Sequence, residues 1–112
     1  MKKVEAIIRH LKLDEVKTAL DAIGVKGMTV TDVKGAGKQK GYTEQWRGNK
    51  LSVFLNPKLE LKIIVPDDMV ASVIDTIVET ARTGEIGDGK IFVSTIDDVV
   101  AIRTGSRGDE AL

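Results

Sequence analysis

Glycine and lysine residues that could bind an anion gather in the stretch Gly84-Glu-Ile-Gly87-Asp-Gly89-Lys90. Its glycines could turn backbone N–H groups toward a phosphate, and Lys90 would add positive charge. The spacing fits part of a P-loop, but Ile91 stands where a Ser or Thr should reach magnesium. A P-loop also runs from strand to helix, whereas here we expect a helix before the stretch and a strand after it. A tight helix-to-strand connection is the alternative, and the spacing alone leaves both open.

A second candidate is the basic stretch from Lys34 to Gly41, Lys-Gly-Ala-Gly-Lys-Gln-Lys-Gly. Residues 34–50 carry five basic residues and one acidic residue, although the whole chain has a formal net charge of zero. Glycines permit close backbone approach, and the lysines favour an anionic ligand. The glycine spacing does not fit a dinucleotide fingerprint. A solvated basic loop is the alternative interpretation.

The C-terminal stretch and two loop aromatics complete the set of candidates. Arg103 and Arg107 could clamp phosphate groups bound to a neighbouring copy of the chain. A frayed polar C-terminus is the alternative. Tyr42 and Trp46 lie in the basic stretch, where an exposed aromatic could anchor a partner protein or fold back onto the domain.

The residue types exclude several kinds of chemistry. The chain has no cysteine and one histidine, His10, so disulfides, cysteine-bound zinc and His-paired nucleophiles are not expected. Glu5 interrupts the N-terminal region where a signal peptide would stay apolar, and no apolar run approaches the roughly 20 residues that span a membrane. We therefore expect a cytoplasmic protein without membrane insertion.

Hydrophobic periodicity predicts the elements that must position these residues. Alternation predicts strands over 3–9, 28–33, 59–65 and 90–95, with a final extended piece over 99–103. Apolar residues at helical spacing predict helices over 13–23 and from Val70 to Ala81, with Asp67 as the N-cap of the second. From Gly35 to Pro57 neither period is sustained. Such long connections in compact domains are often functional.

The order strand–helix–strand, long loop, strand–helix–strand predicts a single α+β domain over residues 1–112. Its simplest form is a ferredoxin-like βαββαβ fold, an antiparallel sheet with both helices on one face. The loop of about 35–57 joins the second and third strands, and a C-terminal segment covers about 102–112. A nucleic-acid-binding domain of this fold is an alternative function. Such a domain needs stacking aromatics on its sheet, and the predicted strands offer only Phe92, so we expect no nucleic-acid partner.

Several stretches spread over the whole chain look like the PII signal-transduction family. The C-terminal signature of that family resembles Thr83-Gly-Glu-Ile-Gly-Asp-Gly-Lys-Ile-Phe-Val93. Four further groups of stretches resemble it: 29–35 (Thr-Val-Thr-Asp-Val-Lys-Gly), 39–44 with 47–48, 65–68 (Val-Pro-Asp-Asp) and 102–105 (Ile-Arg-Thr-Gly). This resemblance is far more specific than any single glycine motif.

The resemblance implies a homotrimer of ferredoxin-like subunits that binds ATP or ADP in the clefts between subunits. It implies a signalling protein and not an enzyme, with at most slow, incidental ATP hydrolysis. Arg103 would approach the phosphates from the adjacent subunit. The other residues expected to bind the nucleotide are Thr29, Gly35, Gly37, Lys38, Gln39, Ile64, Gly87, Asp88, Gly89 and Lys90.

The resemblance also implies a second ligand and a protein target. 2-Oxoglutarate would bind beside a Mg²⁺ ion held by the ATP phosphates, with Gln39 serving the metal. The positions that would serve 2-oxoglutarate are Gln39, Lys40, Gly41 and Lys58. The loop would engage a membrane transporter or a protein of nitrogen metabolism through Tyr42, Trp46, Arg47, Lys50 and Leu51. A transporter partner could recruit the protein to the membrane. An adenine-nucleotide sensor insensitive to 2-oxoglutarate is the alternative within the family.

This chain departs from the family pattern at residues 53–56, where the loop returns, and at four further positions. Leu51 aligns with the tyrosine that many members carry for uridylylation, and Asn49 aligns with a serine phosphorylated in others. Neither modification can occur at these residues, so ligand occupancy is the expected switch. In the nucleotide cleft, Lys62 aligns with a usual acidic residue and Ala101 with a usual arginine. The second change removes a charge-assisted contact to phosphate.

Overall fold

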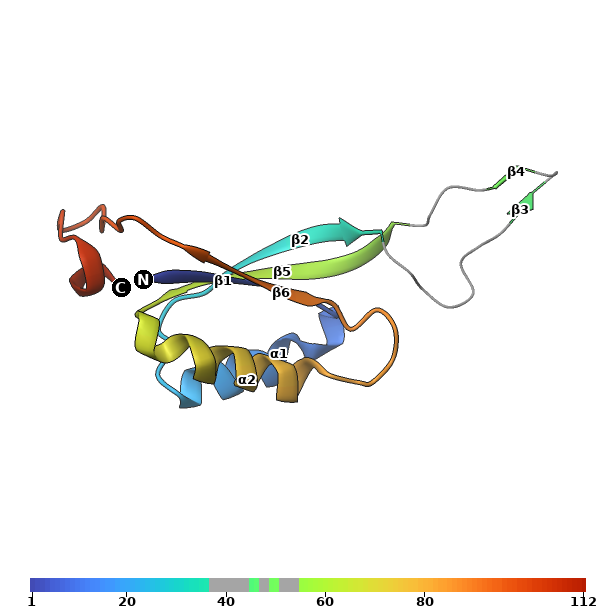
Figure 1. Ribbon diagram of the computed structural model, residues 1–112, viewed down its shortest axis with the longest axis horizontal. Helices are drawn as coiled ribbons and strands as arrows, with labels where there is room; N and C mark the ends of the chain where they lie inside the picture. The colour runs from blue at the N-terminus through green and yellow to red at the C-terminus, as the bar shows by residue number, and fades with distance from the viewer. Residues whose placement is uncertain (37–44, 47–48, 51–54) are drawn as a thin grey trace.

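The computed structural model describes residues 1–36, 45–46, 49–50 and 55–112, and for residues 45–46 and 49–50 it describes the backbone. Six strands, two α-helices and three short 3-10 helices follow one another along these parts of the chain (Figure 1). In order they are β1 (Lys2–Ile8), η1 (His10–Lys12), α1 (Leu13–Ala22), β2 (Thr29–Gly35), β3 (Gln45–Trp46), β4 (Asn49–Lys50), β5 (Asn56–Val65), η2 (Asp67–Met69), α2 (Val70–Ala81), β6 (Lys90–Thr95) and η3 (Gly108–Ala111).

The main sheet has the strand order β2-β5-β1-β6, and every pairing in it is antiparallel. Both helices cover the same face of this sheet (Figure 1). The α+β, ferredoxin-like arrangement predicted from the sequence is therefore confirmed. β3 and β4 pair only with each other, with Gln45 opposite Lys50 and Trp46 opposite Asn49.

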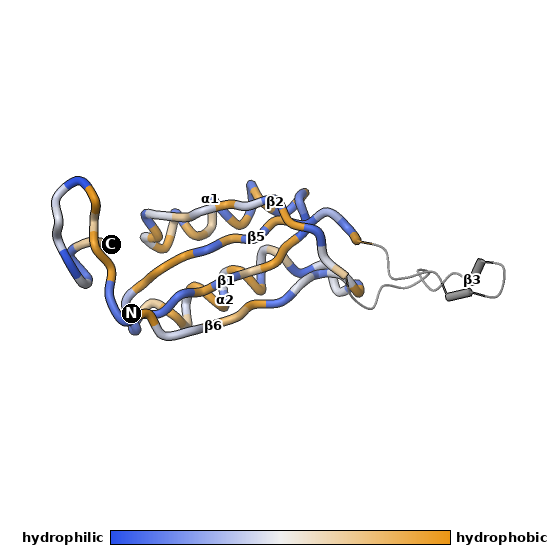
Figure 2. Tube along the Cα trace, turned by 90° about the horizontal axis from the view of Figure 1, so that it is seen from above, coloured by the Kyte–Doolittle hydropathy of each residue, from blue (hydrophilic) through white to orange (hydrophobic). Residues whose placement is uncertain are grey.

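The core lies between the sheet and the helices, and the alternation along the central strands builds it. Apolar and polar residues alternate along β1 and β5 (Figure 2), so that one face of each strand packs on the helices. The buried residues come from both central strands, from the inner faces of both helices and, at one position, from the α1–β2 connection. They are Val4, Ala6, Ile8, Val16, Leu20, Val25, Leu59, Leu61, Ile63, Val65, Val73, Ile77 and Ala81.

Two local predictions are wrong. Residues 99–103 do not form an extended piece, because the chain makes only a single bridge at Val100, to Arg107, and then turns back at residues 102–104. Asp67 does not cap a helix with its side chain. Its carboxylate lies 2.9 Å from the terminal ammonium group of Met1, and α2 begins at Val70, after a 3-10 turn.

The two ends of the sheet carry different parts of the chain. Both chain termini lie at one end, and β2 stops and β5 starts at the opposite end (Figures 1 and 2). In the part of the chain that the structure describes, no helix is long and apolar enough to cross a membrane.

Candidate functional site

Asp88 organises the connection between α2 and β6. One carboxylate oxygen accepts hydrogen bonds from the backbone N–H groups of Thr83 (2.8 Å) and Gly84 (2.9 Å). The other accepts from the Thr83 hydroxyl (2.5 Å) and from Arg9 Nε (3.2 Å). The three bonds from Thr83 and Gly84 close residues 83–88 into a ring, and the fourth joins Asp88 to Arg9.

The same bonds determine the charge state of Asp88. The hydrogen bond from the Thr83 hydroxyl, aided by those from the two backbone N–H groups and from Arg9, holds the pKa of Asp88 well below its usual range. The carboxylate therefore stays ionised at neutral pH. Because all of these donors belong to or contact the connection between α2 and β6, Asp88 stabilises the shape of that connection.

Arg9 ties this connection to the end of β1. Besides its bond to Asp88, its Nη2 donates to the carbonyl oxygen of Ile86 at 3.0 Å. The antiparallel register of β1 and β6 pairs Ile7 with Lys90, so two residues further along, Arg9 faces Asp88. A basic residue just beyond the end of the first strand is the only sequence signal for this role, and neither Arg9 nor Thr83 was among the predicted site residues.

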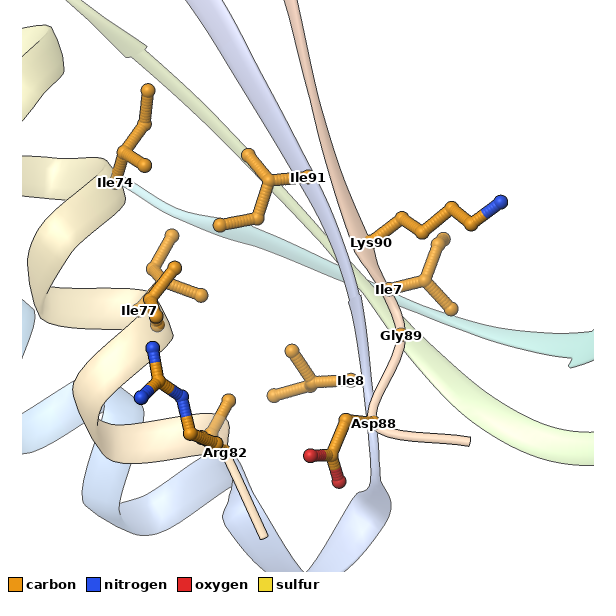
Figure 3. Close-up of a pocket in the computed structure, with 11 residues that line it drawn as sticks. Ile7, Ile8, Ile74, Ile77, Arg82, Asp88, Gly89, Lys90 and Ile91 are labelled. Atoms are coloured by element: carbon orange, nitrogen blue, oxygen red, sulfur yellow. The ribbon is translucent and has the colours of Figure 1, made fainter. Parts of the chain in front are cut away.

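Gly87 and Gly89 both adopt left-handed backbone conformations, with φ of 102° and 103°. A Cβ atom on Gly89 would lie 1.7 Å from the carbonyl oxygen of Ile7, so only glycine fits this close approach to β1. Figure 3 shows Lys90 and Ile7 pointing away from α2, whereas Ile91 points toward it. The Lys90 ammonium is thus presented on the sheet face opposite the helices.

Lys58 brings a second cation to the same place. It is the one buried charged residue of the described chain, with 8% of its surface exposed, and its Nζ donates to the carbonyl oxygen of Gly87 at 2.5 Å. Burial lowers the pKa of Lys58, the Arg9 guanidinium lowers it further, and the Asp88 carboxylate opposes them. A Cβ on Gly35 would lie 3.5 Å from Lys58 Cγ, so the end of β2 packs on the lysine stem.

We call Arg9, Gly35, Lys58 and residues 83–90 the loop-base cluster. It lies where β2 ends and β5 begins, so residues 36–55 start and finish beside it. Backbone N–H groups in a glycine-rich turn, together with two ammonium groups, form an arrangement suited to phosphate or carboxylate groups. The structure thus brings together the predicted residues Gly35, Lys58 and Gly87 to Lys90.

The predicted residues Thr29 and Ile64 lie elsewhere. They line a hollow of about 420 Å³ between the α1–β2 connection, the end of β5 and the C-terminal residues Ala111 and Leu112. We call it the terminal hollow. Thr29 and Gly35 stand at opposite ends of the seven-residue strand β2, so they are about 20 Å apart.

Arg103 is exposed in the turn that follows the Val100 bridge. The N–H of Gly105 donates to Ala101 O (2.7 Å) and the N–H of Ala101 donates to Ser106 O (2.9 Å), which closes this turn. The C-terminal segment lies at the end of the sheet that holds the chain termini (Figure 1). Within one chain, Arg103 therefore belongs with the terminal hollow's end of the sheet and not with the loop-base cluster.

The remaining predicted site residues lie wholly or partly outside the described residues. Trp46 and Lys50 stand in β3 and β4, of which the backbone pairing is described. The residues Gly37, Lys38, Gln39, Lys40, Gly41, Tyr42, Arg47 and Leu51 are not described. Within the described residues, no group of three or more His, Cys, Asp or Glu side chains could hold a metal ion.

The fold and the loop-base cluster define a class of protein: a ferredoxin-like domain in which a glycine-rich turn with two nearby lysines stands at the base of a long loop. Comparison with known proteins identifies the family to which the chain belongs. A family model described as "Nitrogen regulatory protein P-II" matches residues 1–106. The chain belongs to this family of nitrogen regulatory signalling proteins.

Relatives cover the whole chain. It is 54% identical over 112 residues to "Nitrogen regulatory protein P-II 1" of Escherichia coli (strain K12), with all of both chains covered. It is 56% identical over 112 residues to "Nitrogen regulatory protein P-II" of Microchaete diplosiphon and 55% identical to that of Nostoc punctiforme, again with full coverage of both chains.

Proposed function

We propose that this chain is a PII-type sensor for which ATP and ADP compete. Through the loop between β2 and β5, it would signal to a protein partner which nucleotide is bound. The observation that carries this proposal is the loop-base cluster. Its turn of left-handed glycines and its two lysine ammonium groups stand directly at the start and finish of that loop. A ligand bound there would bias the loop's conformation. A partner that prefers one of these conformations would then be bound or released according to the ligand.

We further propose that the nucleotide site is completed between subunits of a homotrimer. The two groups of predicted nucleotide residues lie about 20 Å apart, at opposite ends of β2, and a homotrimer would bring the loop-base cluster of one chain against the terminal end of the next. The exposed apolar surface supports assembly as well. Phe92 is 53% exposed on the helix-free side of the sheet, and the Ile102 side chain is fully exposed in the C-terminal segment.

Lys58 supports 2-oxoglutarate as a second ligand. Within the described residues its buried ammonium forms one hydrogen bond, to a neutral carbonyl, although an ammonium can donate three. A buried cation is stabilised by an anionic partner. A carboxylate of 2-oxoglutarate, held beside a Mg²⁺ ion of bound ATP, would supply that partner and release Gly87.

The partner would be a transporter or a protein of nitrogen metabolism, and the protein would act in the cytoplasm as a regulator and not as an enzyme. Neither modification site of other family members is present, because the aligned residues are Leu51 and Asn49. The ligand state is therefore the proposed switch.

Calorimetric titration of the full-length protein with ATP and with ADP tests the proposal. Both nucleotides should bind at the same sites, so that saturation with ADP reduces the apparent affinity for ATP. Absence of binding of either nucleotide at millimolar concentration would contradict it.

Repeating the ATP titration with Mg²⁺ and 2-oxoglutarate tests the second ligand. ATP should bind more tightly in its presence, because the two ligands share one site. Lys58→Met should remove this effect, and Lys17→Met, which changes an exposed lysine of α1, should leave it in place. If wild-type affinity does not respond to 2-oxoglutarate, the protein is an adenine-nucleotide sensor only.

A further inference from the structure

The terminal hollow contains the predicted nucleotide residues Thr29 and Ile64, and its mostly apolar walls suit the purine base of the proposed nucleotide ligand. Its walls are mostly apolar and include Val25, Met28 and Ile64. The polar side chains among its lining residues are Thr29, Lys26 and Lys62, and none of the lining side chains is acidic. The hollow therefore offers apolar contact to a flat ring, together with hydrogen-bond donors at its edge.

Lys62 is available to a ligand. It lies on β5, opposite Thr29 of β2, and its side chain is exposed on the face of the sheet away from the helices. On the other neighbouring strand, β1, Lys62 faces Glu5. The Glu5 carboxylate forms an ion pair with Lys3 at 3.0 Å. Among the described residues, Lys62 takes part in no ion pair.

The chemistry of these side chains discriminates between purines. An ammonium group only donates hydrogen bonds, and a hydroxyl can either donate or accept. Adenine presents the N6 amino donor beside the N7 acceptor. Guanine instead presents two acceptors, O6 and N7, side by side, and lysine commonly binds this pair. Hypoxanthine has the same 6-keto group and N7. No side chain lining the terminal hollow offers a carboxylate to the amino group of adenine.

We propose that Lys62 extends the ligand class of this site from adenine nucleotides to 6-keto purine nucleotides, by donating a hydrogen bond to the purine O6. The inference rests on the proposed nucleotide-binding function, since it concerns the base-binding part of that same site. It makes Lys62 a specificity-determining residue for the group at position 6 of the purine.

Calorimetry with ATP and ITP on the full-length protein tests this proposal, because inosine differs from adenosine in bearing a 6-keto group and a protonated N1. The wild-type protein should bind ITP with an affinity within about tenfold of that for ATP. Lys62→Glu should shift the ratio of the two affinities toward ATP by about tenfold, since it replaces a charged donor by an acceptor. Lys62→Met should shift the ratio in the same direction by a smaller amount.

Lys17→Met is the matched control, because it removes an exposed lysine on α1, remote from the hollow. The ratio of its affinities for ATP and ITP should equal that of the wild type. Binding of ATP without ITP in the wild type, or a ratio left unchanged in Lys62→Glu, would overturn the proposal while leaving the proposed function intact. Binding of neither nucleotide would overturn both. Circular dichroism of each variant confirms that it is folded, and the two Lys62 variants provide independent readings.

Discussion

At the scale of single residues, the structure separates side chains that would touch a ligand from those that hold the site in shape. Lys58 and Lys90 present ammonium groups, whereas Asp88 directs its oxygens toward Thr83, Gly84 and Arg9. Asp88 was predicted among the nucleotide-binding residues. Its carboxylate is committed within its own turn, so a contribution to binding would come through the backbone that it holds in place.

The bonds to Asp88 predict a pH-dependent contribution to stability. Its pKa in the folded chain lies below its ordinary value, so the contribution is fully present above about pH 5 and is lost progressively as the pH falls from that ordinary value toward the lowered pKa of the folded chain. Asp88→Asn should lower the free energy of unfolding at pH 7 by about 1–2 kcal/mol, because two backbone donors lose a charged acceptor.

Urea unfolding of both proteins, followed by circular dichroism at one protein concentration, measures this effect. The difference between wild type and Asp88→Asn should shrink between pH 5 and pH 3. Asp75→Asn, an exposed carboxylate on α2, serves as the control and should differ little from the wild type at any pH. A difference for Asp88→Asn that is equally large at pH 3 and pH 7 would show that the charge is not responsible.

At the scale of elements, the sheet determines which distant residues meet. Adjacent strands β1 and β6 run antiparallel, which carries the glycine-rich turn to the end of β1 and sets Gly89 against Ile7. The pairing of β2 with β5 places Gly35 beside the stem of Lys58. The loop-base cluster is thus assembled by strand register from four segments of the chain.

Gly89→Ala should disrupt this assembly. The added methyl group would collide with the carbonyl oxygen of Ile7, a backbone atom fixed in the sheet, and φ would stay in the left-handed region that disfavours alanine. We expect a loss of about 2–4 kcal/mol in the free energy of unfolding and weakened ATP binding. Thermal unfolding and calorimetry measure the two effects.

Gly27→Ala is the comparison for stability, because a Cβ there meets no atom within 4 Å. It should change the free energy of unfolding by less than about 1 kcal/mol. Equal melting temperatures for Gly89→Ala and wild type would mean that the turn does not pack against β1 as closely as the structure shows.

The elements themselves could be predicted from the sequence, and their contacts could not. Period-two alternation predicted the four strands of the sheet, and the apolar face of each helix predicted α1 and α2, because burial imposes those periods. The extended piece over 99–103 was a wrong prediction, since a short apolar run beyond the last strand has no neighbour in the sheet and makes a single bridge instead. Asp67 was misassigned because its partner, the amino group of Met1, is distant in the sequence.

The sequence predicted only part of the site, because local patterns do not reveal contacts between residues that are distant along the chain. The glycine spacing and the resemblance to the PII family indicated Gly87, Gly89, Lys90 and Lys58. The role of Arg9 depends on a contact between residues 79 positions apart, and the burial of Lys58 depends on a contact across 29 positions. Local patterns contain no information on either contact.

At the scale of the whole molecule, the two halves of the proposed nucleotide site lie at opposite ends of the sheet. The loop-base cluster stands at the end where β2 stops, and Thr29, Ile64 and Arg103 lie toward the end that holds both termini. In the proposed trimer, the loop-base half of one chain would meet the terminal half of the next, and one nucleotide would contact both. This separation is the central claim of the proposed mechanism.

Mixing two defective chains tests that claim most directly. Lys90→Ala impairs the loop-base half and Arg103→Ala the terminal half, so each alone should weaken ATP binding by about tenfold or more through loss of a charge-assisted contact. Lys90 and Arg103 are both exposed, so neither substitution should affect folding. Co-assembled in equal amounts, the two chains should recover tight binding at about one quarter of the sites, those that combine two intact halves. A mixture that binds ATP no better than either variant alone would contradict a site shared between chains.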